Sequence, residues 1–550
     1  MSPTGCLAQI PAQMHRYSLW LLPLSAALLC RLAWIPLPFT PLLFVAFVPM
    51  LLLERQVANN RQWWQASVLF FLLWNVFTTW WIVNSTIVGA VFAFLANALL
   101  MSIPFMLFRA TRLKLGNRVG YLSFLAYWLA FEHLHQRWEL AWPWLNLGNA
   151  LAALPKYIQW YEYTGAGGGT LWILGVNLAV FMALQPRLFY TTQGIDKLQN
   201  RQPVKNAMLP VVLLLFPVLA SFCIFYTYTE KGKDVEITLV QPSEDPYFIP
   251  DAAQADQQVA TLLSLSEKAL TPNTRYLVFP EAALPDAIWL HEFNQQTRIE
   301  QLRQWLRQYP NLKLVSGFTA LQHYNQPHAT PTASPYLQQP GSYDVFNSSF
   351  QIDTTNRLQV YHKSKLVPGV EKIPYQQLFG VLTPLISALG GGMGSFGSQP
   401  HRTVFRGTDS LGIAPVICYE SVFGQYLTDY VKKGAQLIFI MTNDGWWGNT
   451  DGYRQHLHYA SLRAIETRRS IARAANTGIS CFIDQRGIVR SSLGWQQRSA
   501  QNGTVKANTA LTCYVQYGDF IGRTALLLAA ILILFTFVSR FTPHFSNKIR

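Results

Sequence analysis

Long charge-free stretches separated by short polar connections dominate the first 230 residues of the chain. No Asp, Glu, Lys or Arg occurs between residues 61 and 109, between 162 and 187, or between 205 and 230. A membrane-spanning helix needs about 20 apolar residues, so the first stretch has room for two such helices and each of the others for one. A last apolar stretch lies near the end of the chain. We predict eight spans, at residues 18–36, 38–54, 66–83, 87–108, 119–134, 168–186, 208–227 and 518–539.

Two of these predicted spans contain residues that a membrane disfavours. Glu132 and His133 lie at the end of the fifth span, which makes it the weakest of the eight. Arg31 lies near the end of the first span, where a charge is costly unless the side chain reaches the interface.

A different pattern begins near residue 235, where short apolar runs alternate with amphipathic stretches. This order predicts an α/β sandwich with buried strands. Strands are expected at 235–240, 276–279, 312–317, 349–353, 358–361, 413–418, 437–441 and 480–484, helices near 252–270 and 295–308, and loops at 322–342 and 388–400. The second loop contains Gly392, Gly394 and Gly397 in a dinucleotide-binding spacing, but no strand leads into it, so we interpret it as a flexible loop.

The two patterns divide the chain into three predicted parts. Residues 1–230 are expected to form a membrane domain with seven spans, residues 231–517 a catalytic domain outside the membrane, and residues 518–550 a final span with a cytoplasmic tail. We interpret the N-terminus as an uncleaved anchor, because more spans follow it.

Composition and charge agree with a membrane protein. Hydrophobic residues make up 50% of the chain and charged residues only 13%, about half the usual share. The net charge of +15 does not indicate nucleic-acid binding, because the basic residues gather in alternate connections and no reader motif is present. This asymmetry follows the positive-inside rule and predicts that residues 231–517 lie outside the cytoplasm. The connections predicted to face the cytoplasm hold Arg55, Arg61, Arg109, Arg112, Lys114, Arg118, Arg187, Lys197, Arg201 and Lys205.

The cysteines show neither a metal-binding nor a disulfide-rich pattern. The chain has six, and none forms a CxxC or Cys/His spacing, so we expect no metal and no cofactor. Cys481 and Cys513 share the outer domain and are free to pair in a compartment that permits disulfides. His456 and His458 also lack the spacing of metal ligands.

Three residues with complementary chemistry each lie next to a predicted strand. Glu281 follows the run that ends in Val-Phe-Pro, Lys363 lies in Val-Tyr-His-Lys-Ser-Lys, and Cys418 ends Ala-Pro-Val-Ile-Cys-Tyr-Glu. A carboxylate whose pKa is raised by partial burial can take the thiol proton, and a lysine can favour the thiolate and stabilise an oxyanion. Together the three residues can perform acyl transfer through a thioester.

Each of these residues also has an ordinary structural interpretation. A cysteine at a strand end is more often a small buried hydrophobe, and a lone Glu or Lys beside a strand is usually solvated. Arg463, Glu466 and Arg473 are interpreted as a structural ion-pair set on one helix face rather than as catalytic residues.

Together these motifs resemble a known family. Glu281, Lys363 and Cys418 in this order are similar to the Glu-Lys-Cys set of the nitrilase, or carbon–nitrogen hydrolase, superfamily. A domain of that type between seven spans and one final span resembles the apolipoprotein N-acyltransferase family, over nearly the whole chain. The supporting segments are 142–145 (Trp-Pro-Trp-Leu), 363–368 with Glu371, 417–420 (Ile-Cys-Tyr-Glu), 442–448 (Thr-Asn-Asp-Gly-Trp-Trp-Gly), 463–466 and 476–478.

The resemblance implies a fold, a reaction and a location. The outer domain would be an α-β-β-α sandwich. Cys418 would take an acyl chain from a phospholipid and pass it to the N-terminal diacylglyceryl cysteine of an apolipoprotein, in a ping-pong reaction. The protein would lie in the bacterial inner membrane as a monomer, with its catalytic domain in the periplasm and the lipid bilayer around its spans.

The resemblance also implies roles for individual residues. Glu281 would be the base, Lys363 the oxyanion stabiliser, and Glu371, Tyr419 and Glu420 would support the site. The family often has Pro-Phe-Gly-Glu where this chain has Pro-Gly-Val-Glu, so the role of Glu371 is less well supported. Three aromatic residues are candidates for acyl contact, with membrane anchoring as an equal alternative for the two tryptophans: Trp446, Trp447 and Tyr247.

Two other functions remain open at this stage. The same three residues would serve a membrane-anchored amidase that hydrolyses a small carbon–nitrogen substrate, although such an enzyme needs one anchor rather than eight helices. A transporter with a degenerate outer domain would instead require charge pairs or broken helices within the spans.

Overall fold

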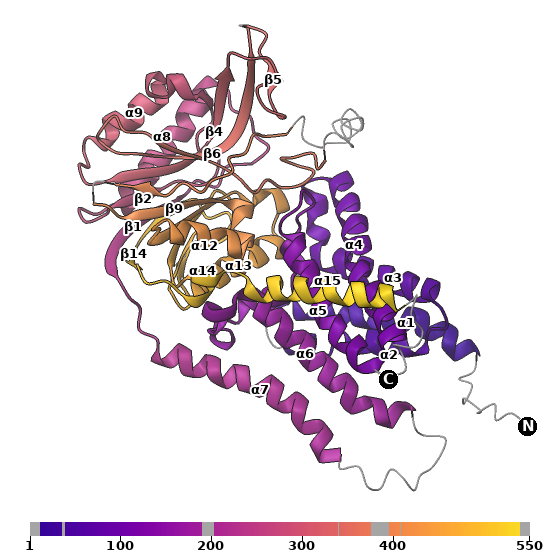
Figure 1. The fold of residues 1–550 in the computed structure, drawn as a ribbon. Coiled ribbons are helices and arrows are strands. Elements are labelled where there is room, and N and C mark those ends of the chain that lie inside the picture. The colour runs from indigo at the N-terminus through magenta and orange to yellow at the C-terminus, as the bar shows by residue number, and fades with distance from the viewer. Residues whose placement is uncertain are drawn as a thin grey trace, which may run out of the picture.

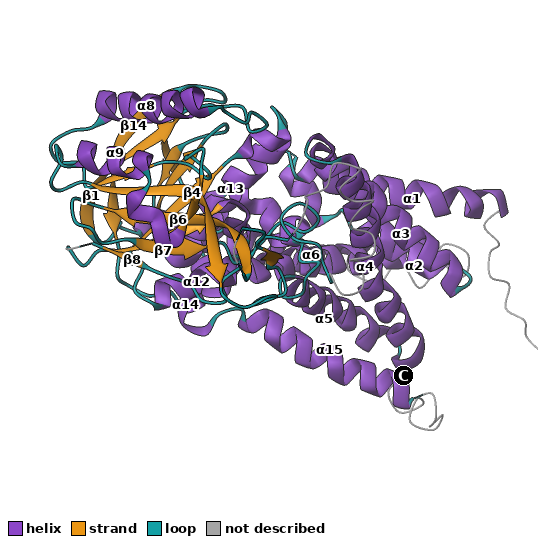
Figure 2. Ribbon diagram, turned by 90° about the horizontal axis from the view of Figure 1, so that it is seen from above, coloured by secondary structure: helices purple, strands orange, loops and turns teal. Residues whose placement is uncertain are grey.

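The chain folds into a helical part and a two-sheet part that contact each other closely (Figure 1). We describe a computed structural model, which covers residues 12–35, 39–189, 203–338, 340–375, 395–407 and 409–539. Figure 2 shows the helical part on one side of the molecule and the strands on the other.

The helical part contains nearly all the predicted spans as helices. Its elements are α1 (Ala12–Ala33), η1 (Thr40–Phe44), α2 (Val48–Gln56), α3 (Asn60–Thr79), η2 (Trp80–Asn84), α4 (Ile87–Leu115), α5 (Asn117–His135), α6 (Tyr161–Phe189), α7 (Pro203–Thr227) and α15 (Phe520–Val538). Short 3-10 turns connect α5 to α6: η3 (Pro143–Leu145), η4 (Leu147–Ala153) and η5 (Pro155–Tyr157).

Five helices, rather than the eight predicted, are long and apolar enough to cross a membrane within the described residues. They lie at Asn60–Asn84, Ile87–Leu115, Tyr161–Leu184, Met208–Thr227 and Phe520–Val538. The prediction at 38–54 is wrong as one span because prolines begin both η1 and α2, and α2 has only nine residues. At about 1.5 Å per residue, α2 is too short to cross a bilayer. The first span reduces to the shorter apolar segment Tyr17–Ala33, and α5 has 19 residues but ends in polar ones.

The second part is an α/β sandwich, as the sequence predicted. Among the described residues, one sheet has eight strands in the order β14-β1-β2-β4-β6-β5, with β3 on β4 and β7 on β6, and the other has six in the order β13-β12-β11-β10-β9-β8. The first sheet consists of β1 (Lys233–Gln241), β2 (Tyr276–Val278), β3 (Ala287–Trp289), β4 (Lys313–Tyr324), β5 (Ser334–Pro335), β6 (Ser342–Ile352), β7 (Gln359–His362) and β14 (Ser499–Ala507). The second consists of β8 (Phe405–Arg406), β9 (Gly412–Ile417), β10 (Leu437–Thr442), β11 (Ser470–Ala475), β12 (Cys481–Ile483) and β13 (Val489–Ser492).

Helices cover the outer faces of the two sheets. The helices α8 (Ala252–Ala269) and α9 (Thr297–Leu306) share an apolar core with the first sheet, and α12 (Gly424–Lys432) and α13 (Asp451–Thr467) pack with the second. Between the sheets, apolar side chains interdigitate, for example Tyr276 with Phe439 at 5.3 Å between ring centroids. Such burial is the main favourable term that holds the sandwich together.

Three local predictions have different outcomes. Most of the expected loop 322–342 does connect two strands, because β4 ends at Tyr324 and β6 begins at Ser342, and among the described residues between them only the short β5 pairs with β6. Cys481 and Cys513 are both free, so they do not form a disulfide. Residues 388–394 of the other expected loop lie outside the described residues.

Aromatic residues join the two parts into one core. Trp81 and Trp144 of the helical part pack against Trp447 of the sandwich, at 4.8 and 5.5 Å between ring centroids. Arg31, which the sequence marked as costly, forms an ion pair with Asp451 of α13 at 2.7 Å. The junction therefore explains both the tryptophans and the charge in α1.

Candidate active site

Cys418 lies at the carboxyl end of β9, in the first position of the short helix η9 (Cys418–Val422). Its φ of +48° belongs to the left-handed region, which is uncommon for a residue other than glycine. The turn is held by its own carbonyl oxygen, which accepts hydrogen bonds from Ser421 Oγ at 2.8 Å and His456 Nε2 at 3.1 Å. Strained backbone of this kind persists where the surroundings over-determine it, often at functional sites.

A cluster of one lysine, two glutamates and one asparagine lies beside the thiol. Lys363 Nζ contacts Glu281 Oε1 at 3.2 Å and Glu371 Oε1 at 2.7 Å, and its side chain is 1% exposed. Asn347 Nδ2 donates to both carboxylates, at 2.8 and 2.9 Å. The backbone N–H of Asn443 donates to Glu281 Oε2 at 3.0 Å. The structure therefore brings Glu281, Lys363 and Glu371 together, as the order of motifs predicted.

Neighbouring strands position this cluster. Glu281 follows β2, and Lys363 follows β7, where its backbone N–H donates to Asn347 O in β6. Gly317 in β4 passes so close to Glu281 that a Cβ at this position would lie 2.7 Å from the Glu281 Cα. Only glycine allows that approach without displacement of the backbone.

The electrostatics of the cluster keep the thiol protonated and the lysine charged. Burial raises the pKa of Cys418 well above its ordinary value, the Glu281 carboxylate raises it further, and Lys363 lowers it. Burial alone would lower the pKa of Lys363, but Glu281 and Glu371 outweigh burial and hold this pKa above its ordinary value. A thiol in this state can act as a nucleophile only if a base takes its proton, and the ammonium is a permanent positive charge.

Glu420 serves the backbone around the site rather than the thiol itself. Its carboxylate accepts hydrogen bonds from Tyr361 OH at 2.5 Å, Tyr426 OH at 2.7 Å and the backbone N–H of Ser364 at 2.7 Å. Burial raises the pKa of Glu420, and these hydrogen bonds oppose the increase. Glu420 thus fixes η9 relative to the segment that carries Lys363.

A second buried ionic cluster lies behind Cys418, and the sequence did not reveal it. Asp444 contacts Arg473 Nη2 at 2.6 Å and His456 Nδ1 at 3.0 Å, and all three side chains are fully buried. Burial would raise the pKa of Asp444, but Arg473 and His456 lower it to about 2. The predicted grouping of Arg473 with Arg463 and Glu466 is wrong, because α13 ends at Thr467 and Arg473 lies in β11.

Arg463 and Glu466 form a separate pair at 3.2 Å, as expected for residues one helical turn apart. The sequence predicted no role for His456, because this residue lacks the spacing of a metal ligand. Its real partners, Asp444 and the Cys418 carbonyl, are brought close only by the fold.

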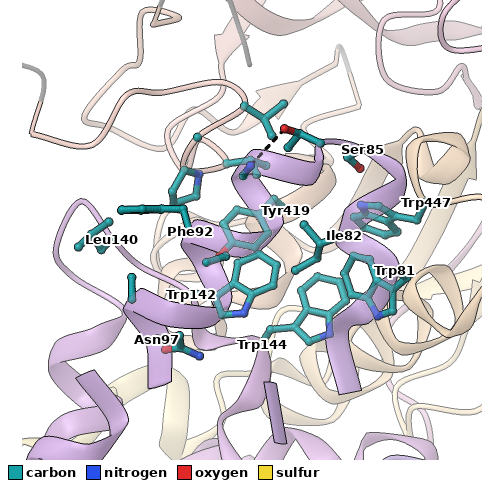
Figure 3. Close-up of a pocket in the computed structure, with 18 of the residues that line it drawn as sticks. Trp81, Ile82, Ser85, Phe92, Asn97, Leu140, Trp142, Trp144, Tyr419 and Trp447 are labelled. Atoms are coloured by element: carbon teal, nitrogen blue, oxygen red, sulfur yellow. Dashed lines mark hydrogen bonds between the residues drawn. The ribbon is translucent and has the colours of Figure 1, made fainter. Parts of the chain in front are cut away.

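Cys418 and Tyr419 line an apolar cavity whose walls come mostly from the helical part (Figure 3). The cavity has about 870 Å³ of empty space, a figure that includes the solvent at its open mouth. Tyr419 OH donates to Ala141 O at 2.9 Å, and its ring stacks on Trp142. Most of the remaining walls come from η2, the start of α4, and the 140–144 and 367–370 segments, with His135 at the end of α5 and Trp447 of the sandwich. The remaining lining residues are Trp81, Ile82, Ser85, Thr86, Gly89, Phe92, Ala93, Ala96, Asn97, Leu100, His135, Leu140, Trp144, Val367, Pro368, Gly369, Val370 and Trp447.

The three aromatic candidates for acyl contact occupy different places. Trp447 lines the cavity. Trp446 and Tyr247 do not line it, but pack against each other at 5.0 Å and remain 38% and 58% exposed. Tyr247 OH donates to Asn84 O at 3.1 Å, so this pair lies beside the η2 wall. Within the described residues, no group of three His, Cys, Asp or Glu is arranged to hold a metal ion.

Comparison with known proteins assigns the chain to a family. Residues 236–512 match the family described as carbon-nitrogen hydrolase, so the chain belongs to that superfamily. Residues 26–179 match the apolipoprotein N-acyltransferase N-terminal domain. Together the two matches place the chain among the apolipoprotein N-acyltransferases.

Two relatives that cover nearly the whole chain agree with this assignment. An apolipoprotein N-acyltransferase of Chlorobaculum tepidum is 27% identical over 531 residues, which cover 93% of this chain and 95% of the relative. One from Allorhizobium ampelinum is 28% identical over 547 residues, with coverage of 93% and 95%. Among solved structures, Nit3 of Saccharomyces cerevisiae, a member of branch 10 of the nitrilase superfamily, matches 50% of this chain and 93% of its own at 14% identity, with a TM-score of 0.36.

Proposed function

We propose that this protein transfers an acyl chain from a membrane phospholipid to the α-amine of the N-terminal diacylglyceryl cysteine of an apolipoprotein. One observation carries the proposal: Cys418 lies between a carboxylate–ammonium cluster and an apolar cavity whose walls come from the helical part. The cluster supplies acid–base chemistry, and the cavity suits an acyl chain. A hydrolase of small soluble substrates has no need of such a cavity.

In the first step, Glu281 takes the proton from Cys418 Sγ as the sulfur attacks the carbonyl carbon of the sn-1 ester. The carbonyl oxygen becomes an oxyanion, which Lys363 Nζ and the backbone N–H of Tyr419 stabilise. When the oxyanion collapses, the carbon–oxygen bond to glycerol breaks and Glu281 returns the proton to the glycerol oxygen. A thioester and a lysophospholipid result.

In the second step, the neutral α-amine of the acceptor attacks the thioester carbon. A carbon–nitrogen bond forms, the carbon–sulfur bond breaks, and Glu281 moves one amine proton to the departing sulfur. The product is an amide, and Cys418 is again a thiol. Because nucleophile, base and cation all come from one chain, a monomer suffices.

We assign the catalytic part to the outer face of the bacterial inner membrane. The order of helices supports this orientation, because α3 ends and α4 begins beside the sandwich, where Trp81 packs on Trp447. The basic residues Arg61 and Arg112 lie at the opposite ends of these helices, as the positive-inside rule requires of the cytoplasmic side.

The test is the mass of the intact protein after incubation with phospholipid alone. An adduct of one acyl chain at Cys418 that hydroxylamine removes is the expected result, and Cys418→Ala gives none. Subsequent addition of a diacylglyceryl-cysteine peptide should discharge the adduct to the peptide amide. An adduct that water discharges at the same rate without the peptide would indicate a hydrolase, and no adduct from any phospholipid would refute the thioester mechanism.

A further inference from the structure

A groove lined by three basic side chains lies next to the apolar cavity at Cys418, which we call the acyl cavity. Arg137, Lys365 and Arg402 line it together with polar and aromatic residues, and Asp429 is its one acidic lining residue within the described chain. The groove has about 450 Å³ of empty space, counting its open side. The other lining residues are Gln136, Phe423, Gln425 and Tyr426.

The three basic residues are held in place, so the groove does not depend on flexible surface chains. Arg137 Nη1 donates to His133 O at 2.6 Å, and Lys365 Nζ donates to Gln136 O at 3.1 Å. Lys365 also lies over the ring of Phe423 at 4.9 Å, and Arg402 over the ring of Tyr426 at 3.7 Å. Ring faces attract cations, and these contacts orient both side chains at the groove.

The charge of the groove is only partly balanced. Arg402 contacts Asp429 at 3.5 Å, which leaves a net excess of positive charge among the lining residues. Burial, followed by repulsion from Arg402 and Arg137, lowers the pKa of Lys365 to about 8. A bound anion would relieve this repulsion. The first turn of α12 also lines the groove, and helix N-termini carry a partial positive charge.

The groove adjoins the acyl cavity through neighbouring residues. His135 lines the cavity and Gln136 the groove, while the ring of Tyr419 in the cavity wall packs on Phe423 of the groove at 5.1 Å. Lys365 is separated from the cavity-lining Val367 by one residue. An acyl ester at Cys418 and a charged group in the groove can therefore belong to one molecule.

The groove also lies at the level where helices enter the apolar region. Arg137 follows the end of α5 by two residues, and the side chain of Gln425 lies close to Gly518, just before α15 begins. In Figures 1 and 2, α12 lies near the start of α15. Phosphate groups of a bilayer occupy this level, immediately outside the hydrocarbon.

We infer that this groove binds a phosphate group, supplied by the headgroup of the donor phospholipid while its sn-1 ester lies at Cys418. Arg137, Lys365 and Arg402 would bind the phosphate oxygens through charge-assisted hydrogen bonds, which are stronger than neutral ones. This inference rests on the proposed acyl transfer and adds to it the part of the donor that is recognised. Phosphate is common to all glycerophospholipids, so the groove would select phospholipid over diacylglycerol rather than one headgroup over another.

The experiment compares two donors with the same acyl chains, phosphatidylethanolamine and diacylglycerol, in detergent micelles with the full-length protein. The rate of thioester formation at Cys418 is measured against the mole fraction of each donor. Arg402→Gln should raise the half-saturating mole fraction of phosphatidylethanolamine about tenfold, as expected for loss of a charged hydrogen bond. Arg402→Gln should not change the half-saturating mole fraction of diacylglycerol. Lys365→Gln should act in the same way.

The matched control is Lys432→Gln, which removes a positive charge from the exposed side of the same helix, outside the groove. It should behave as the wild type with both donors. Variants that slow both donors equally, or that slow only transfer to the acceptor peptide, would overturn the phosphate assignment. Inorganic phosphate that competes with phosphatidylethanolamine in the wild type, and not in Arg402→Gln, would show that the groove also takes the free anion.

The design separates failure of this inference from failure of the proposed function. If no donor acylates Cys418 in the wild-type protein, the acyl-transfer mechanism itself is wrong. If phosphatidylethanolamine and diacylglycerol acylate Cys418 with equal efficiency, and Arg402→Gln changes neither, only the phosphate groove is wrong. Thermal unfolding of each variant shows whether a loss comes from the fold.

Discussion

Two buried ionic clusters meet at Cys418, and they differ in what they contact. The cluster of Lys363, Glu281 and Glu371 keeps 8% and 12% of its two carboxylate side chains exposed. The cluster of Asp444, Arg473 and His456 has no exposed side-chain surface and contacts the backbone carbonyl of the nucleophile. In the proposed mechanism only the first cluster exchanges a proton with the thiol, so burial and ion pairing alone would not identify the reactive groups.

The largest effect is expected when the thiol of Cys418, beside which both clusters lie, is removed. Cys418→Ala should lower acyl transfer by at least about 10³-fold, because no other nucleophile replaces the sulfur. Both ionic clusters keep their partners in this variant, so the thermal unfolding temperature should stay close to that of the wild type. Retained acyl transfer by the purified variant would show that neither cluster acts through this thiol.

Lys363→Met should reduce the rate of thioester formation by about 10²–10³-fold, as for loss of an oxyanion-stabilising group. It should also destabilise the protein, because Glu281 and Glu371 then face each other without a cation. The double variant Lys363→Met/Glu371→Gln separates the two effects. Its unfolding temperature should recover and its rate should not; recovery of both would make the lysine structural only.

Asp444→Asn should lower the stability of the fold more than the rate of the reaction, in contrast to Lys363→Met. Arg473 would remain fully buried without its carboxylate, and loss of one partner from a buried pair costs about 3–5 kcal/mol of unfolding free energy. The rate per folded molecule should fall much less than in Lys363→Met. Asp451→Asn, at the partly exposed pair with Arg31, is the control and should cost less than about 1 kcal/mol. An inactive but fully stable Asp444→Asn would assign the second cluster to the chemistry as well.

The pH dependence of stability should follow Asp444. Because its folded pKa is lowered to about 2, its contribution is fully present above the ordinary aspartate pKa of about 4 and is lost as pH falls towards 2. The difference in unfolding free energy between wild type and Asp444→Asn should therefore shrink between pH of about 4 and about 2. A constant difference across this range would contradict the ion pair.

The smallest expected effect concerns the link between the second cluster and the nucleophile. Ser421 Oγ bonds both the Cys418 carbonyl at 2.8 Å and His456 Nε2 at 2.9 Å. Ser421→Ala should lower the unfolding free energy by about 1 kcal/mol and slow thioester formation only a few-fold. A loss as large as that of Lys363→Met would mean that the turn at Cys418 needs this hydroxyl for reactivity.

The sequence predicted that Glu281 and Lys363 lie near Cys418, because each of the three residues follows a strand. In a sandwich of buried strands, residues just after neighbouring strands gather at one edge, so Glu281, Lys363 and Cys418 were recognisable in order. The second cluster has no such local pattern: Asp444, His456 and Arg473 come from a turn, a helix and a strand, and only the fold joins them.

Other differences arise because composition alone does not show where prolines interrupt a helix or which elements pack together. Hydropathy counted residues 38–54 as one helix, but the prolines that begin η1 and α2 break it. Apart from Cys418, Tyr419 and Trp447, the residues that line the acyl cavity were not predicted, because small residues such as Gly89 and Ala96 acquire a role only when α4 lies beside Tyr419.

The cavity with walls from two parts of the chain also has a pharmacological meaning. Most of its lining belongs to helices that soluble amidases of the same superfamily need not possess, whereas the sulfur and its lysine belong to the shared sandwich. An inhibitor that joins a sulfur-reactive electrophile to an aliphatic tail would therefore draw its potency from the sandwich. Its selectivity would come from the tail, enclosed by the tryptophans of the helices.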